Sequence, residues 1–430
     1  MESLRIDNTG KLIVSGMQQA NGILEISGAK NSVLPIMAAC ILTDEKIILR
    51  NVPDISDVNT MIEILESSGK TVNRVKDTLY IEKSEKINSE IPYEPVRKMR
   101  ASFNVYGPLT VINKISKVAL PGGCSLGARP VNFHIDGLMK LGIESKIEHG
   151  FVYGKIKPIE KSEVHISLDF PSVGATEHIL TTATLIDGVK TIINNCAMEP
   201  EIDDLANFLN KMGANIEGIG TSKIIIHGVK KLHGIDYKVI PDRIEAGTFI
   251  IMGALIGKNL TIKNINAEHL ESLFSKLDEM NIEYNLKGNE VKISSSLNKK
   301  LNATIIDTAP YPGFPTDLQS QMMVLCSLID GRTTIKENIF SNRLSIIDEL
   351  NRMGANIKAE NNNLAIVDGV RFLSGAPVQA TDLRSSAALL LAALVAEGET
   401  IINNVDHIFR GYEKIEEKLK NVGIKIEYYE

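Results

Sequence analysis

Hydrophobic and polar positions follow each other along this chain in an order that recurs six times. Each recurrence begins with a helix that is apolar on nearly every side, such as VLPIMAACIL, and continues through a short strand to a two-faced helix such as EIDDLANFLNKMG. A helix that is apolar all round is typical of a protein core, whereas a two-faced helix keeps one side in water. The pattern therefore predicts six α/β units, each with a buried helix, a surface helix and short strands.

The units keep a regular spacing. The two-faced helix ends near a residue type that tolerates the left-handed backbone. These residues recur every 68 to 73 positions, at Gly69, Gly142, Gly213, Asn281, Gly354 and Gly423. In four units a second glycine lies 23 to 25 residues earlier, at Gly188, Gly257, Gly331 and Gly398. The two sets of residues keep a nearly constant distance from each other along the sequence. This regularity argues against chance similarity of helical and strand segments.

Six units of this size exceed a single core, so we expect two domains of three units each. Turn residues cluster at 14–22 and 237–247, which are the predicted crossings between the domains. If the N-terminal strand joins the last three units, residues 21–239 form one domain and residues 1–20 plus 240–430 form a discontinuous second domain. The expected fold class is α/β (α+β mixed), with parallel buried helices enclosed by three sheets in each domain.

Composition narrows the functional classes. The chain has 430 residues with 32 Gly, 5% aromatic residues and no Trp, and its formal net charge is −6. This charge argues against binding to nucleic acid through bulk charge. The longest apolar run, 387–396, is too short to span a bilayer, and MESLRIDNTG lacks the apolar segment of a signal peptide. We expect a cytoplasmic protein with no nucleic-acid or membrane partner.

The four cysteines are far apart and form no CxxC pair, which predicts neither a disulfide framework nor a zinc site. Cys40, Cys196 and Cys326 lie in helix or strand contexts and are expected to be buried. Cys124 differs because its loop, LPGGCSLGARP (120–130), is rich in Gly and Pro and also carries Arg129. A thiol on such a loop near a guanidinium is expected to be exposed and acidified.

Basic residues recur where the buried helices are expected to begin. Lys30, Arg100, Arg243 and Arg384 lie at that level, and Arg129, Arg343 and Arg410 lie in connectors. Helix N-termini add free N–H groups and a positive dipole end. If the helices of each domain point the same way, two positive faces form a cleft for a polyanion. The alternative for any one of these residues is a solvated surface charge.

Asp317 has two interpretations. It follows Pro315 and Thr316 at the expected start of a helix, so it is either a charge that stabilises the helix N-terminus or a general base beside an anion site. Asp382 holds the equivalent place in ATDLR and is the comparison for the first interpretation. The sequence contains no P-loop, no HExxH motif and no GxGxxG motif after a strand.

Longer motifs run from one end of the chain to the other. They include SGAKNSVLPI, VRKMRASF, LPGGCSLGARPV, PSVGATEHI, PDRIEAGTF, GFPTDLQ, FSNR, ATDLRSSAAL and HIFRGYEKIEEKL. In these motifs the chain resembles the UDP-N-acetylglucosamine 1-carboxyvinyltransferases, a branch of the enolpyruvyl transferase family. LPGGCSLGARPV and GFPTDLQ are the most specific, and the shikimate branch lacks the cysteine loop. One departure is Phe170, where some members carry Lys.

The resemblance implies a two-domain inside-out α/β barrel of six βαβαββ repeats, three per domain. It implies transfer of the enolpyruvyl group of phosphoenolpyruvate to the 3′-hydroxyl of UDP-N-acetylglucosamine, with release of phosphate, as the first committed step of peptidoglycan precursor synthesis. It further implies that no metal and no organic cofactor is needed. Separately, we expect a monomer. Two alternatives stay open: a shikimate-type enolpyruvyl transferase, and a non-catalytic paralogue that senses either ligand.

The resemblance also implies roles for single residues. Cys124 matches the proton donor, which forms a thioether adduct with phosphoenolpyruvate and is alkylated by fosfomycin, and Asp317 matches the proposed base. Residues expected to bind phosphoenolpyruvate are Lys30, Asn31, Arg129 and Arg410, with Arg343 and Arg384 as arginines involved in closure and binding. Residues expected to contact the UDP-sugar are Arg100, Arg129, Pro130, Val131, Asn132, Phe133, Ser172, Val173, Gly174, Asp317 and Ile339.

Overall fold

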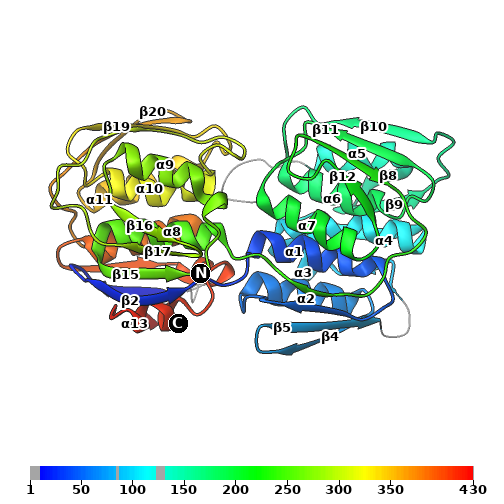
Figure 1. Cartoon of the computed structure of the whole chain (residues 1–430), viewed down its shortest axis with the longest axis horizontal. Coiled ribbons are helices and arrows are strands. Elements are labelled where there is room, and N and C mark those ends of the chain that lie inside the picture. Colours follow the sequence, from blue (N-terminus) through cyan, green and yellow to red (C-terminus); the bar gives the residue numbers. More distant parts are fainter. Residues whose placement is uncertain (1–9, 84–86, 123–130, 430) are drawn as a thin grey trace, which may run out of the picture. The chain divides into compact units, whose positions relative to one another are not determined.

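The computed structural model describes residues 10–83, 87–122 and 131–429, and it divides into two compact units (Figure 1). The middle unit lies between Ser27 and Pro241. The terminal unit combines the chain up to Ile26 with the chain from Asp242 onward. The sequence places these boundaries a few residues earlier, at 20/21 and 239/240.

The middle unit holds three four-stranded sheets, with strand orders β14-β3-β5-β4, β6-β7-β9-β8 and β10-β11-β13-β12. The strands are β3 (Ile47–Arg50), β4 (Lys70–Val75), β5 (Thr78–Lys83), β6 (Glu90–Ile91), β7 (Ile115–Ala119), β8 (Ile143–Glu148), β9 (Phe151–Ile156), β10 (Glu163–Ser167), β11 (Lys190–Asn194), β12 (Asn215–Glu217), β13 (Lys223–His227) and β14 (Asp236–Lys238). The helices are α1 (Lys30–Ala39), η1 (Cys40–Leu42), α2 (Ser56–Ser67), α3 (Tyr93–Lys98), η2 (Arg100–Val105), α4 (Tyr106–Asn113), α5 (Asn132–Lys140), α6 (Val173–Ala183) and α7 (Pro200–Lys211), where η marks a 3₁₀ helix.

The terminal unit also holds three four-stranded sheets, with strand orders β22-β23-β1-β24, β16-β17-β15-β2 and β18-β19-β21-β20. The strands are β1 (Lys11–Ser15), β2 (Ala20–Glu25), β15 (Gly257–Lys263), β16 (Tyr284–Lys287), β17 (Glu290–Ile293), β18 (Ile305–Asp307), β19 (Arg332–Lys336), β20 (Asn356–Asn361), β21 (Leu364–Asp368), β22 (Pro377–Gln379), β23 (Glu399–Asn403) and β24 (Glu427–Tyr429). The helices are α8 (Arg243–Ile256), η3 (Ala267–Leu270), α9 (Glu271–Glu279), η4 (Thr316–Leu318), α10 (Gln319–Cys326), η5 (Arg343–Ile346), α11 (Ile347–Arg352), α12 (Leu383–Val395), η6 (Val405–Arg410) and α13 (Ile415–Asn421).

One sheet shows the order of elements that the units repeat. Strands β10 and β11 are parallel and are joined by α6. After α7, β12 and β13 form an antiparallel pair, and β13 also pairs with β11. Six sheets of this kind, three in each unit, confirm the expected inside-out α/β architecture built from βαβαββ repeats.

Two strands lie in a different unit from the helix that follows them. β2 pairs in parallel with β15 in the terminal unit, although the next helix, α1, belongs to the middle unit. β14 pairs in parallel with β3 in the middle unit, although α8 follows it in the terminal unit. The chain therefore leaves each unit directly after it has contributed an edge strand to that unit.

Buried helices form the centre of each unit. In the middle unit α6 contacts α1 and α4, and in the terminal unit α8, α10 and α12 contact one another. The two cores consist mainly of Ile, Leu, Val, Ala and Met, with few rings, and they share no residue. The buried positions of Cys40, Cys196 and Cys326 are confirmed.

The residues expected to end the surface helices have the predicted left-handed backbone. Their φ angles lie between 63° and 102°, at Gly69, Gly142, Gly213, Asn281, Gly354 and Gly423. Among the described residues, no helix is long and apolar enough to cross a membrane.

Candidate active site

The expected site residues fall into two groups, one in each unit. Cys124, Arg129 and Pro130 lie outside the described residues. The middle unit holds Lys30, Asn31, Arg100, the segment 131–133 and the segment 172–174. The terminal unit holds Asp317, Ile339, Arg343, Arg384 and Arg410. Each group is described within its own unit.

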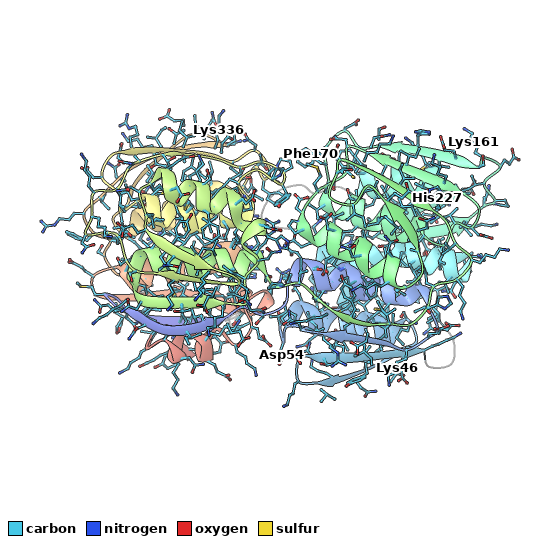
Figure 2. All side chains as sticks on the ribbon, viewed as in Figure 1. Lys46, Asp54, Lys161, Phe170, His227 and Lys336 are labelled. Atoms are coloured by element: carbon cyan, nitrogen blue, oxygen red, sulfur yellow. The ribbon has the colours of Figure 1, made fainter. Side chains whose placement is uncertain are left out.

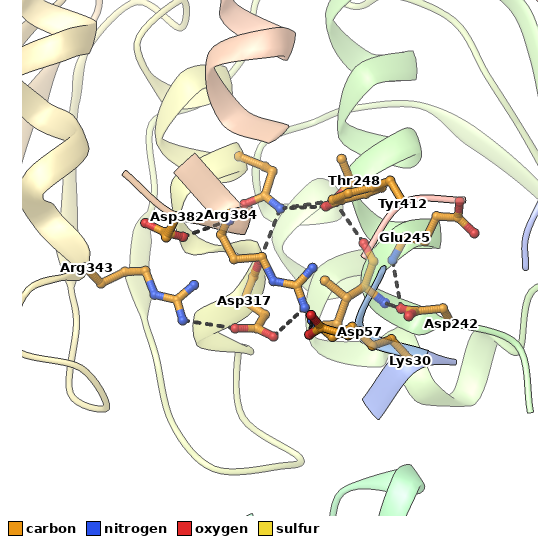
Figure 3. Close-up of polar contacts among 12 residues, drawn as sticks. Lys30, Asp57, Asp242, Glu245, Thr248, Asp317, Arg343, Asp382, Arg384 and Tyr412 are labelled. Atoms are coloured by element: carbon orange, nitrogen blue, oxygen red, sulfur yellow. Dashed lines mark hydrogen bonds and ion pairs between the residues drawn. The ribbon is translucent and has the colours of Figure 1, made fainter. Parts of the chain in front are cut away.

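Lys30 opens α1 and is held by a carboxylate from the next helix. Its Nζ lies 2.7 Å from Oδ2 of Asp57 in the first turn of α2, and the two side chains are only 11% and 7% exposed (Figure 3). A buried ammonium needs such a counter-charge. The backbone there is equally constrained, because a Cβ on Gly28 would lie 1.7 Å from the carbonyl oxygen of Asn51. Asp57 was not singled out from the sequence, since nothing in its local pattern connects it with Lys30.

The structure brings two of the expected UDP-sugar segments together. Ser172 is the N-cap of α6, and its Oγ accepts a hydrogen bond from the backbone N–H of Ala175. Asn132 and Phe133 open α5, which contacts α6. A Cβ on Gly174 would lie 3.2 Å from the ring of His134. His134 belongs to α5, so its ring lies directly against the first turn of α6. The absence of a side chain at Gly174 therefore allows this approach.

The protons on two buried histidines can be assigned from their contacts. The backbone N–H of Gly107 donates to Nε2 of His178 at 2.8 Å, and Nδ1 of His178 lies 3.0 Å from Nδ1 of His134. His178 therefore carries its proton on Nδ1 and donates it to His134, which carries its own proton on Nε2. Burial, with a smaller contribution from the charge of Arg100, lowers the pKa of His134 to about 3. His134 is thus a neutral N–H donor beside Gly174.

In the terminal unit, Asp317 lies between two arginines. Its Oδ1 accepts from Nη2 of Arg343 at 3.0 Å, and its Oδ2 accepts from Nη2 of Arg384 at 2.6 Å (Figure 3). The arginine side chains are 2% and 8% exposed and the Asp317 side chain is 24% exposed. Burial alone would lower the pKa of Arg384, but the charge and hydrogen bond of Asp317 together with the charges of Tyr412 and Asp242 outweigh it and raise that pKa above its usual value. The three residues form a tightly paired charge cluster.

Asp382 behaves differently from Asp317. Its Oδ1 accepts from the backbone N–H groups of Arg384 and Ser385, and Ser385 Oγ accepts from the N–H of Asp382, which completes a capping box on α12. The helix-charge interpretation is therefore confirmed for Asp382. Both carboxylate oxygens of Asp317 instead accept from arginines.

Arg343 keeps unused hydrogen-bonding capacity. Its Nε and Nη1 are buried and have no hydrogen-bond partner in the described part of the chain. The guanidinium carbon lies 5.0 Å from the centre of the Phe340 ring, which adds a cation–π contact. Buried donors without partners are uncommon in proteins and are expected where a ligand supplies the acceptor.

Glu337 connects the segments that carry Asp317 and Ile339. This residue is 1% exposed and accepts hydrogen bonds from the hydroxyl of Thr316 and from the backbone N–H groups of Ile339 and Phe340. It was not predicted, because its sequence context KENIF shows only a charged residue after a strand. Arg410 ends η6 and is partly exposed, and η6 contacts α12, the helix of Arg384.

The chemistry available to these groups is anion binding and proton transfer. Amide groups at the start of α6, the N–H of His134 and the guanidinium of Arg343 are donors suited to phosphate or carboxylate oxygens. Among the described residues, no three His, Cys, Asp or Glu side chains are placed to hold a metal ion. Phe170 is 40% exposed (Figure 2).

Comparisons with known proteins agree with this chemistry. The family model described as EPSP synthase (3-phosphoshikimate 1-carboxyvinyltransferase) matches residues 14–419. The chain is 53% identical over 422 residues to the UDP-N-acetylglucosamine 1-carboxyvinyltransferase of Thermotoga petrophila, covering 98% of this chain and 99% of that protein. It is 48% identical over 416 residues to UDP-N-acetylglucosamine 1-carboxyvinyltransferase 1 of Caldanaerobacter subterraneus, covering 97% and 99%.

Solved structures with the same fold include two enolpyruvyl transferases. The enolpyruvyl transferase NikO from Streptomyces tendae has a TM-score of 0.89 at 25% identity, covering 98% of this chain and 99% of that chain. EPSP synthase from Acinetobacter baumannii has a TM-score of 0.73 at 17% identity, covering 98% and 100%. The second likeness concerns the fold alone.

Proposed function

The chain belongs to the EPSP synthase family and, within it, to the UDP-N-acetylglucosamine 1-carboxyvinyltransferases, and from this premise we propose that it transfers the enolpyruvyl group of phosphoenolpyruvate to the 3′-hydroxyl of UDP-N-acetylglucosamine and releases phosphate. The observation that carries the proposal is the 53% identity that extends over 98% of the chain. The product would be the first committed precursor of peptidoglycan, made in the cytoplasm.

The proposed reaction is an addition followed by an elimination. Cys124 donates a proton to the methylene carbon of phosphoenolpyruvate, which creates a cationic centre at the adjacent carbon. The sugar hydroxyl attacks that centre as Asp317 removes its proton, and a tetrahedral ketal forms. Loss of a proton from the new methyl group and departure of phosphate then restore the double bond. Arginines would offset the phosphate and carboxylate charges throughout.

The geometry around Asp317 adds a requirement to this scheme. A carboxylate that accepts from two guanidiniums is a poor acceptor for a third proton, because its lone pairs and its charge are already engaged. We propose that the anionic groups of phosphoenolpyruvate draw Arg343 and Arg384 away from Asp317 and so free it to act as the base. The unpartnered Nε and Nη1 of Arg343 support this assignment.

We propose that Lys30, Asn31, Arg129 and Arg410 also bind phosphoenolpyruvate. Asp57 would keep the Lys30 ammonium charged and oriented. The UDP-sugar would contact Arg100, residues 131–133, Ser172, Val173, Gly174 and Ile339, with Arg129 and Pro130. The neutral N–H of His134 would supply a donor near the first turn of α6, where Phe170 offers no positive charge.

A phosphate-release assay tests the proposal. We expect phosphate only when phosphoenolpyruvate and UDP-N-acetylglucosamine are both present, and none when shikimate 3-phosphate replaces the UDP-sugar. Turnover with shikimate 3-phosphate would favour the shikimate-type alternative, and binding of both proposed substrates without product would favour the ligand-sensing alternative. No phosphate and no binding would reject the proposed substrates altogether.

The role proposed for Cys124 has its own test. Cys124→Ala should abolish turnover and the covalent mass increase produced by fosfomycin, while titration calorimetry still detects UDP-N-acetylglucosamine. Full activity in this variant would reject the proton-donor role. We further propose a monomer, which sedimentation velocity of the active enzyme can check.

A further inference from the structure

Glu337 joins two loops of the candidate active site from a fixed place in the terminal unit. It follows Lys336, the last residue of β19, an interior strand that pairs with β18 and β21 (Figure 1). Its backbone N–H donates to the carbonyl oxygen of Asn363 at 2.8 Å, and the residue is buried. The carboxylate therefore extends from a backbone that the sheet supports on both sides.

One oxygen of this carboxylate holds the loop that leads to Asp317. Thr316 opens η4 directly before Asp317, and its hydroxyl donates to Oε2 of Glu337 at 2.9 Å. The start of the same loop is closed by a hydrogen bond from the N–H of Ala309 to the carbonyl of Phe314 at 3.1 Å. The bond between Thr316 and Glu337 therefore anchors the loop at the residue next to the proposed base.

The other oxygen holds the segment that contains Ile339. Oε1 of Glu337 accepts from the backbone N–H groups of Ile339 at 2.8 Å and of Phe340 at 3.0 Å. Asn338 connects this segment to the residue after β18, because its Nδ2 donates to the carbonyl oxygen of Thr308 at 2.8 Å. One carboxylate thus fixes two backbone segments relative to each other: the segment of the proposed base and the segment proposed to contact the UDP-sugar.

The arginines beside Asp317 are not suited to hold it in place during the proposed reaction. Asp317 accepts from Arg343 and Arg384 in this structure, but both arginines are proposed to turn to phosphoenolpyruvate. When the proton is removed, the base therefore needs a support that involves neither arginine. The bond between Thr316 and Glu337 is such a support. Burying a carboxylate is costly unless its hydrogen bonds are satisfied, and here three donors satisfy it.

We propose that Glu337 and Thr316 are positioning residues that align Asp317 with the 3′-hydroxyl of the sugar. The proposal rests on the function proposed above, in which Asp317 is the base and Ile339 contacts the UDP-sugar. Glu337 and Thr316 act through the backbone of these two segments and not through contact with a substrate. A base that is displaced by about 1 Å should slow the chemical step and leave the binding of both substrates almost unchanged.

Steady-state kinetics of matched variants test the proposal. Thr316→Val keeps the branched side chain and removes the hydroxyl, so we expect kcat to fall about tenfold, with the KM values for both substrates changed by less than about twofold. Thr316→Ser keeps the hydroxyl and should restore most of kcat. Glu337→Gln should also retain most of it, because the amide oxygen can accept from both N–H groups while the amide nitrogen donates to the Thr316 oxygen.

A second pair of threonine and glutamate provides the control. In the same unit the hydroxyl of Thr304 donates to Oε2 of Glu279, and neither residue belongs to the two segments that Glu337 holds. Thr304→Val should leave kcat and both KM values unchanged. If Thr316→Val keeps the wild-type kcat, or if Thr316→Ser does not restore the lost kcat, the proposal is overturned.

Hydrogen exchange measured by mass spectrometry separates this proposal from the proposed function, because it does not require turnover. We expect the amides of residues 316–319 to exchange faster in Thr316→Val than in wild type, Thr316→Ser and Glu337→Gln. Wild-type protein that does not release phosphate from the two proposed substrates rejects the proposed function alone. Unchanged exchange in Thr316→Val rejects the positioning role, whether or not the protein turns over.

Discussion

Two aspartates at equivalent places in the repeat have different partners in this protein. Asp382 caps α12 through backbone N–H groups, whereas Asp317 accepts from Arg343 and Arg384. The local sequences PTDLQ and ATDLR hardly differ, so the distinction arises from what each carboxylate meets in space. A matched pair of substitutions can therefore separate a capping role from a role in the site.

We expect Asp317→Asn to reduce kcat/KM by about 100-fold or more, because an amide cannot accept the proton of the sugar hydroxyl. It should also lower the free energy of unfolding by about 3 kcal/mol, since two buried guanidiniums lose their counter-charge. Asp382→Asn should leave both quantities almost unchanged, because Asn caps helices as well as Asp. Phosphate release and urea unfolding measure the two effects. Equal losses in the two variants would contradict the distinction.

Glu177 is a second residue whose environment predicts a measurable effect. It lies in α6, is 6% exposed, and accepts from Asn104 Nδ2 at 2.7 Å. Burial is the main cause that raises the pKa of its carboxyl to about 8; the hydrogen bond from Asn104 opposes the shift, and the charges of Glu201 and Glu199 act in the same direction as burial. The folded protein therefore keeps a proton here that the unfolded chain releases at a lower pH.

The sign of the pH dependence follows from this difference. Below the unfolded pKa, near 4.5, both states are protonated. As the pH rises toward about 8, only the unfolded state ionises, so stability falls across this window and levels off above it. Glu177→Gln should remove that loss and be more stable than wild type at pH 8.5, by a difference on the order of several kcal/mol.

Denaturant titrations at several pH values between 4.5 and 8.5 check this prediction for Glu177→Gln. The matched control is Glu66→Gln on the exposed face of α2, which should reproduce the wild-type pH dependence. Parallel curves for Glu177→Gln and wild type would mean that the Glu177 carboxyl ionises in the folded protein at its ordinary pKa.

At the scale of elements, the repeat depends on one backbone conformation at the end of each surface helix. Gly423 follows α13 with a φ of +83°, and a Cβ there would meet no atom within 4 Å. Any effect of Gly423→Ala therefore reports the backbone conformation alone. We expect a loss of about 1 kcal/mol in the free energy of unfolding, because an L-residue is strained in the left-handed region.

Chemical unfolding measures this loss, and Lys420→Ala provides the control. Lys420 is exposed in the last turn of α13 and has ordinary helical geometry, so its replacement should change stability by less than about 0.5 kcal/mol. The fourth member of the set, Asn281, has a φ of +63° and shows that the repeat accepts Asn at this position. A neutral Gly423→Ala variant would contradict the proposed role of the left-handed turn.

The elements could be predicted from the sequence, whereas the contacts between them could not. Apolar periodicity and the spacing of Gly residues are properties of single segments, so they identified the buried helices and the six repeats. The pairs Lys30–Asp57 and Asp317–Arg384 join residues on different elements, and no pattern within one element specifies its partner.

At the scale of the whole molecule, the two ends of the chain must meet to complete the terminal unit. β1 is an interior strand of the sheet β22-β23-β1-β24. Its neighbours β23 and β24 come from the opposite end of the sequence. Val14 on this strand and Ile193 on β11 are both fully buried, but they belong to separate cores. Each unit should therefore have a stability of its own, and damage to one core should not spread directly through shared core residues.

Two matched substitutions test this independence. Val14→Asp places an unpaired charge in the terminal core, and Ile193→Asp does the same in the middle core. Burying such a charge costs several kcal/mol. This cost approaches the whole free energy of unfolding of a domain, which is roughly 5–15 kcal/mol. Hydrogen exchange measured by mass spectrometry should show lost protection in residues 242–429 for Val14→Asp and in residues 27–241 for Ile193→Asp. Since separate cores share no buried side chain, the undamaged unit should retain its protection in each variant. Loss of protection throughout the chain in either variant would mean that the units unfold as one, and that the boundary between them carries stability comparable to the cores.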